Sequence, residues 1–247
     1  MTFPSITSII VDTESPKLIL FDFDGTLADS SLGIYTAFCA ACAETTLKPP
    51  PIDLFRKAIG PPISEIFDHY FPSELPDAKV AFVSEFRKEY DSSLYCCCDW
   101  YEGVIAGIRS LASGGFILGV VTNKPTLPTV RLLQDANLID QFALVAGIDA
   151  RKTALPFPSK TMALSWALQQ LSMLPEEAVY CGDTLADFIA CRPLDLSFVG
   201  VTYGFFDWQT KTQNLAKIPN PNTPSDNSLL RGYFDCFKDV VGFFLGK

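Results

Sequence analysis

The feature that most constrains the fold is an alternation of apolar strands and helices between residues 104 and 201. Helices and strands that alternate with short links form parallel sheets covered by helices on both faces. An earlier apolar run, "KLILFDF" at 17–23, also suits a strand that is covered on both faces. We therefore predict an α/β fold with a doubly wound parallel sheet. Its predicted helices are 104–113, 127–136, 159–171 and 184–192, and its predicted strands are 116–122, 142–147, 178–181 and 196–201.

A block of helices interrupts this alternation after the first strand. The helices predicted there are 28–44, 52–59, 63–71 and 77–95. We predict an inserted helical domain at 32–98, a core built from 17–31 and 99–247, and an N-terminal extension at 1–16. Within that extension, "SIIV" (8–11) can add an edge strand, and the chain closes with a short strand and a helix in "YFDCFKDVVGFFLG".

Three predicted strands end in side chains that can do chemistry. The first strand runs into "DFDGT" (22–26), the next into "TNK" (122–124), and a later one into "GDTLAD" (182–187). In open α/β sheets, ligands bind beyond the carboxyl ends of the strands. We therefore expect these three segments to meet at one site.

The first segment indicates a metal ion. Asp22 and Asp24 lie two residues apart on an extended segment, so their side chains point the same way. Two neighbouring anions repel each other unless a positive group lies between them. Together with Asp183 they make an all-oxygen site, which suits Mg²⁺. Such a metal would let an aspartate attack a phosphate, and aspartyl-phosphate formation is a known covalent strategy.

The same segments offer groups that can hold a phosphate. Gly25 allows close approach of the backbone, whose N–H groups can face the anion. Thr122 can donate a hydrogen bond to a phosphate oxygen. We predict Gly25, Thr26 and Lys124 as substrate-binding residues.

Composition narrows the possible partners. The chain has 247 residues and a net charge of −9, which argues against nucleic acid or anionic lipid as a partner. A protein this acidic would need local cations to handle a phosphate, namely a metal ion and one or two lysines. No apolar run is long enough to span a bilayer, and eight cysteines without a secretory signal favour a reducing, cytoplasmic location. The single histidine, His69, excludes mechanisms that need two.

Several segments resemble the haloacid dehalogenase superfamily. "DFDGTLADS", "VVTNKP" and "YCGDTLAD" resemble its first, second and fourth motifs. "YEGVIAGIRSLASGGFILGVVTNKP" and "LPEEAVYCGDTLADFIACR" are similar to its phosphoglycolate-phosphatase-like members. The resemblance covers residues 17 to 205 and implies a Rossmann-like core with a mobile helical cap that closes over the site.

The resemblance also implies catalytic roles. Asp22 would be the nucleophile. Asp24 would protonate the leaving alcohol and then activate water, and its backbone carbonyl would reach Mg²⁺. Asp22 and Asp183 would supply metal-binding carboxylates, and Asp187 would lie beside the metal or reach it through water.

The remaining implied roles concern the substrate. Thr122 and the N–H of Asn123 would hold the phosphate. "AIGPPISEI" (58–66) resembles the cap loop of the family, which makes Gly60 a candidate for substrate contact. The resemblance implies a small phosphorylated metabolite as the partner. Relatives accept small phosphorylated acids, sugar phosphates, nucleotides or pyrophosphate, and phosphoglycolate is favoured among these.

Asp24 indicates which reaction the resemblance implies. Dehalogenases of the superfamily lack this aspartate and phosphonate hydrolases have alanine there, so Asp24 favours a phosphate ester. A sugar-phosphate phosphomutase keeps the residue, and it is the enzymatic alternative. A non-catalytic relative that uses the cap for binding is the other alternative.

The third motif of the superfamily departs from its usual pattern. Relatives usually show a lysine in "Lys-Pro-x-Pro", but here Leu155 precedes the prolines of "LPFPSK". Counting back from Asp183 favours Lys160, at the first turn of the helix predicted at 159–171. Lys152 and Lys124 are the alternatives. A cation at a helix N-terminus is disfavoured by about 0.3–1 kcal/mol, which a partner such as Asp22 would justify.

Overall fold

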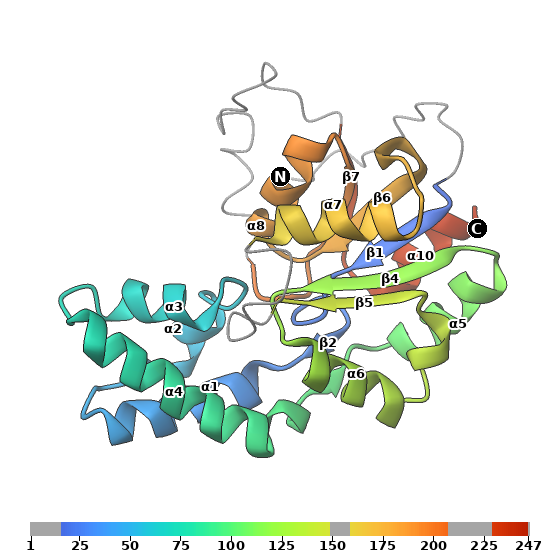
Figure 1. Cartoon of the computed structure of the whole chain (residues 1–247). Helices are drawn as coiled ribbons and strands as arrows, with labels where there is room; N and C mark the ends of the chain where they lie inside the picture. Colours follow the sequence, from blue (N-terminus) through green and yellow to red (C-terminus); the bar gives the residue numbers. More distant parts are fainter. Residues whose placement is uncertain (1–15, 149–158, 207–228, 247) are drawn as a thin grey trace, which may run out of the picture.

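The computed structural model describes residues 16–148, 159–206 and 229–246. At its centre lies a six-stranded sheet of order β5-β4-β1-β6-β7-β8, in which neighbouring strands are parallel (Figure 1). The strands are β1 Leu18–Phe21, β4 Ile117–Thr122, β5 Leu144–Gly147, β6 Ala178–Gly182, β7 Ser197–Val201 and β8 Leu230–Phe234. The predicted doubly wound parallel sheet is thus confirmed, with β1 at its centre.

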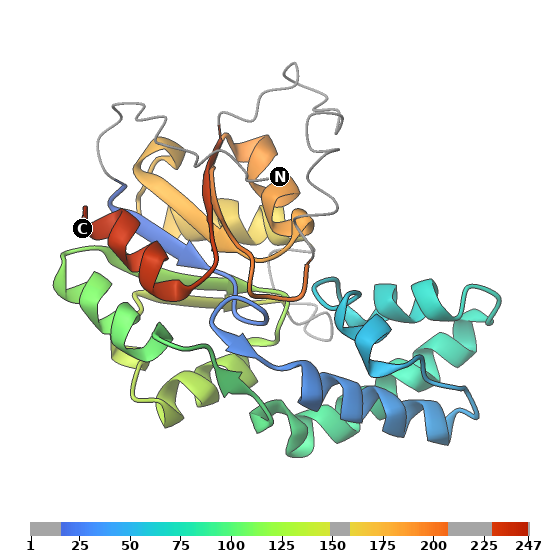
Figure 2. The same ribbon diagram turned by 180° about the vertical axis from the view of Figure 1, so that it is seen from behind.

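Helices cover both faces of this sheet (Figures 1 and 2). Alternate side chains of β1 face opposite layers: Ile19 and Phe21 pack with α5 and α10, whereas Leu18 and Leu20 pack with α7 and α8. All four are fully buried, which explains why the strand reads as a continuous apolar run. The core helices are α5 Val104–Ser113, α6 Thr126–Asp135, α7 Lys160–Gln170, α8 Leu185–Cys191 and α10 Phe237–Leu245.

The predicted helical cap is inserted after β1 and lies at one end of the sheet (Figure 1). It has its own aromatic core, in which the rings of Phe38 and Phe82 lie 4.9 Å apart. The sheet-bearing part of the chain adds Phe205 to that core. The cap elements are α1 Ser31–Glu44, α2 Ile52–Arg56, α3 Ile63–Tyr70, α4 Pro76–Ser92 and a 3₁₀ turn at Leu94–Cys96.

The predicted start of the first cap helix, at residue 28, is wrong. Residues Ala28–Asp29 form strand β2, which pairs antiparallel with β3 at Asp99–Trp100. The Asp29 carboxylate accepts hydrogen bonds from the N–H and the hydroxyl of Ser31, so the helix begins at Ser31. The two crossings between core and insertion therefore lie side by side, next to the predicted boundaries at 31/32 and 98/99.

Two further predictions concern residues outside the described ranges: the edge strand at 8–11 and the position of Lys152. None of the helices in those ranges combines the length and the apolar character that a membrane span requires.

Candidate active site

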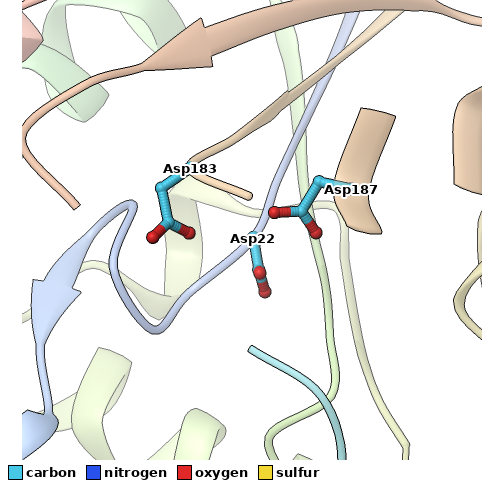
Figure 3. Close-up of side chains that lie close together, drawn as sticks. All are labelled: Asp22, Asp183 and Asp187. Atoms are coloured by element: carbon cyan, nitrogen blue, oxygen red, sulfur yellow. The ribbon is translucent and has the colours of Figure 1, made fainter. Parts of the chain in front are cut away.

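Three buried aspartates meet where β1 and β6 end (Figure 3). Phe21 of β1 is paired with Cys181 of β6, so Asp22 and Asp183 leave neighbouring strands at almost the same level. Asp187 comes from the first turn of α8. One carboxylate oxygen from each residue lies within 4.8 Å of the others, and each residue is at most 3% exposed. The ends of β1 and β6 therefore lie together, as the sequence predicts.

A helix cap fixes the position of Asp187. The Thr184 side chain accepts the N–H of Asp187, and the Asp187 carboxylate accepts both the N–H and the hydroxyl of Thr184 at 2.9 and 2.6 Å. This reciprocal arrangement is a capping box, and it follows directly from the "TLAD" sequence. One carboxylate oxygen of Asp187 already accepts the hydrogen bonds from Thr184. Asp187 is therefore better placed to hold the other side chains of the cluster than to bind a metal ion through both of its oxygens.

One main-chain and one side-chain hydrogen bond orient Asp183. Its carboxylate accepts the N–H of Phe205 at 2.8 Å and the Thr26 hydroxyl at 3.4 Å. Gly25 has a φ of +82°, and a Cβ built on it would lie 2.2 Å from Asp183 Oδ2. A side chain at residue 25 would therefore be strained and would also occupy the space of the carboxylate. Gly25 is the residue that lets this loop pass so close to Asp183.

Lys160 is the cation of the cluster. Its Nζ donates to Asp22 Oδ2 at 2.8 Å and to Asp187 Oδ1 at 2.5 Å. Ser159 caps α7 by accepting the N–H of Met162, so the helix begins at Lys160, which lies in its first turn as predicted. Lys160 is only 9% exposed. Burial favours the neutral amine, but the charges of Asp187 and Asp22 outweigh it and raise the pKa of Lys160 above its usual value.

The carboxylates themselves are crowded. Burial raises the pKa of Asp22 to about 6, although the Lys160 charge opposes the rise. Burial and the charges of Asp187 and Asp22 raise the pKa of Asp183 well above its usual value. A further positive charge among these oxygens would relieve the repulsion.

Asp24 points to a different partner. Its Oδ1 accepts from Lys124 Nζ at 3.0 Å, and it is absent from the three-aspartate cluster. Lys124 also donates to the hydroxyl of Tyr90, a residue of α4 in the cap. The two predicted aspartates of the first motif are thus each paired with a separate buried lysine.

A partly open cavity lies between the core and the cap. Asp22, Asp24, Thr122, Asn123 and Lys124 line it from the core. Its cap side is mostly apolar and includes Ile34, Ile59, Gly60, Ile63, Ile66, Phe86 and Arg87. The same cavity is therefore lined by the predicted nucleophile, the predicted acid–base and the predicted phosphate-binding residues.

Gly60 meets this cavity through its backbone. Its carbonyl accepts from the Asn123 side chain at 2.7 Å, and its φ is +134°. A Cβ there would lie 3.1 Å from the Thr184 side chain. The cap loop predicted to contact substrate thus lies against two of the three strand-end motifs.

Sequence reasoning missed two residues of this site. Tyr90 lies four residues after Phe86 in α4, which reads as part of an apolar helix stripe and signals only packing. Phe205 follows β7 in a segment without a motif, yet its N–H binds Asp183 and its ring joins the cap core. Neither position carries a local signal, because both contacts join distant parts of the chain.

Comparisons of the sequence and of the fold with known proteins point to the same protein family. The family model for haloacid dehalogenase-like hydrolases matches residues 19–201. Tyrosine-protein kinase PtkA from Mycobacterium tuberculosis is 32% identical over 201 residues, which cover 81% of this chain and 67% of that protein. Phosphoglycolate phosphatase from Neisseria meningitidis serogroup A is 30% identical over 215 residues, which cover 84% and 89%. In fold, a haloacid dehalogenase-like family hydrolase from Streptococcus pneumoniae superposes with a TM-score of 0.78 at 24% identity, covering 93% of this chain and 99% of that one.

Proposed function

Because the chain belongs to the haloacid dehalogenase-like hydrolase family, we propose that it is a Mg²⁺-dependent phosphatase acting through an aspartyl-phosphate on Asp22. One observation carries the proposal: two aspartates, Asp22 and Asp24, line one cavity and are held by two different lysines. A nucleophile and an acid–base need separate surroundings, and this arrangement supplies them.

The residues at the strand ends fit a magnesium ion. Their donors are all oxygens, which hard cations prefer, and burial leaves the carboxylates with raised pKa values that a cation would lower. Asp22 and Asp183 would hold the metal with their carboxylates and Asp24 with its main-chain carbonyl, while Asp187 supports Lys160. When bound, the metal would neutralise negative charge on the phosphate and on the nucleophile.

The proposed reaction has two steps. First, an oxygen of Asp22 attacks phosphorus, the bond from phosphorus to the alcohol oxygen breaks, and Asp24 gives that oxygen a proton. In the second step, water attacks the phosphorus on Asp22 while Asp24 takes a proton from that water. The bond from phosphorus to the Asp22 oxygen breaks, which releases inorganic phosphate and restores the Asp22 carboxylate. Lys160 holds Asp22 in place throughout, and Thr122 and Asn123 bind the phosphate oxygens.

For the substrate, we propose a small phosphorylated metabolite, with phosphoglycolate as the first compound to test. The name of the Neisseria relative supports this choice. We further propose a cytoplasmic location, which is supported by the eight cysteines, all of them described and all free thiols.

The test is release of inorganic phosphate from a panel of phosphorylated metabolites with and without Mg²⁺. We expect turnover of at least one small monoester, and loss of it on chelation. A phosphomutase would instead return an isomer of a sugar phosphate, and a binding relative would release nothing from any compound. Phosphorylation of protein tyrosine by ATP belongs in the same panel, because one relative carries that name.

A further inference from the structure

Lys124 is a buried cation that is surrounded by hydrogen-bond partners and aromatic rings. Its side chain is 1% exposed, and its Nζ donates to Asp24 Oδ1 at 3.0 Å and to the Tyr90 hydroxyl. The rings of Tyr90 and Phe23 lie 4.9 and 5.5 Å from the ammonium. A buried charge is costly unless it is paired, so these contacts hold the lysine in one place.

Asp24 is held by this lysine at the edge of the cavity. Its side chain is 16% exposed and lines the cavity, while Oδ1 is occupied by Lys124. A carboxylate that is anchored through one oxygen can turn the other toward a reacting group. The ion pair therefore restricts the orientations that Asp24 can adopt.

The third member of this chain of contacts comes from the cap. Tyr90 lies in α4, is 3% exposed, and stacks on Phe86 in the cap core with ring centres 5.4 Å apart. Its position is thus set by the packing of the cap. Lys124, by contrast, follows β4 of the sheet. The contact between their polar ends exists only while the cap is seated on the core.

We propose that Tyr90 and Lys124 are positioning residues, which hold Asp24 for water activation only while the cap is seated. The inference rests on the proposed phosphatase function and adds to it a direct link from cap packing to the acid–base. It assigns to a cap residue an effect on the hydrolysis of the aspartyl-phosphate, a step in which the leaving alcohol has already departed.

The experiment measures how fast phosphorylated Asp22 decays, by rapid quench with a phosphorylated substrate. Tyr90→Phe removes only the hydroxyl, and we expect it to slow decay about fivefold, in keeping with one hydrogen bond. Lys124→Met should slow decay about thirtyfold, less than the roughly 10²-fold or more that loss of the base itself costs. Tyr70→Phe is the matched control, because the Tyr70 hydroxyl donates to Leu54 within the cap. It should decay like the wild type.

Repeating these substitutions in the Asp24→Asn variant separates an effect on the position of Asp24 from a general loss of structure. In Asp24→Asn the decay is already slow, and adding Tyr90→Phe or Lys124→Met should slow it by less than twofold. Equal slowing in both backgrounds, or identical behaviour of Tyr90→Phe and Tyr70→Phe, would overturn the inference. If Lys124→Met does not fold, Tyr90→Phe decides alone. Failure of the wild type to form any phosphorylated Asp22 would instead overturn the proposed function.

Discussion

Replacing Lys160 with methionine tests the centre of the site. The change removes both hydrogen bonds of the ammonium, at 2.8 Å to Asp22 and 2.5 Å to Asp187, and leaves buried carboxylates without their lysine. Breaking a buried ion pair costs about 3–5 kcal/mol of folding free energy. For a domain of this size, each kcal/mol lowers Tm by about 2–4 °C, so we expect a fall of about 6–20 °C.

The same variant should lose activity. With Lys160 absent, Asp22 is neither oriented nor kept ionised, and we expect kcat/KM to fall at least ~10²-fold, or about 2.7 kcal/mol of transition-state stabilisation. Lys152→Met is the matched comparison for activity, because Lys152 is the alternative from the third motif. For stability the control is Lys88→Met, whose lysine pairs with Glu85 at an exposed position. A nearly normal Lys160→Met beside an inactive Lys152→Met would refute the assignment.

The stability loss should also depend on pH, measured by thermal unfolding in metal-free buffer. Burial raises the pKa of Asp22 from 3.8 to about 6, so the folded state favours the neutral carboxyl. Such a group contributes stability below about pH 4 and loses that contribution as pH rises through about 6. Without Lys160 the pKa should rise further, so the deficit of Lys160→Met should be largest above pH 6. A deficit that grows toward acid would contradict this reasoning.

Three other predictions follow from the same geometry. Asp22→Asn should abolish turnover, as should chelation of Mg²⁺, and phosphate release above about a tenth of the wild-type rate would argue against Asp22 as nucleophile. Asp24→Asn should lower kcat/KM for alkyl phosphates more than for aryl phosphates, because poor leaving groups need protonation. Phosphorylated enzyme should accumulate in this variant. An equal loss on both substrates without accumulation would exclude the role of Asp24 as both acid and base. Gly25→Ala should inactivate and destabilise the protein, since its Cβ would lie 2.2 Å from Asp183 Oδ2, whereas Gly115→Ala, with φ +91° but nothing within 4 Å, should show only the backbone strain in a thermal melt.

Much of the core was predictable from local patterns. The apolar run before Asp22 reads as a doubly covered strand, and Leu18 to Phe21 are fully buried on both of its faces. The capping box of Thr184 and Asp187 is likewise specified by four consecutive residues. Such features depend on neighbours along the chain, so a sequence suffices to place them. The start of the first cap helix was misplaced because Ala28 and Asp29 pair with Asp99 and Trp100, some seventy residues away.

The sequence by itself predicted which residues gather at the site: the aspartates at the strand ends and, as the favoured of three lysines, the one at the start of α7. Only the tertiary structure decided which lysine serves which aspartate, with Lys160 on Asp22 and Lys124 on Asp24. The structure alone also decided that Tyr90 of the cap meets Lys124. The two lysine–aspartate pairs depend on how the strands and helices of the core pack together, and the Tyr90 contact depends on how the cap packs against the sheet edge. A periodic pattern of apolar residues specifies that a face is buried without specifying what it will touch.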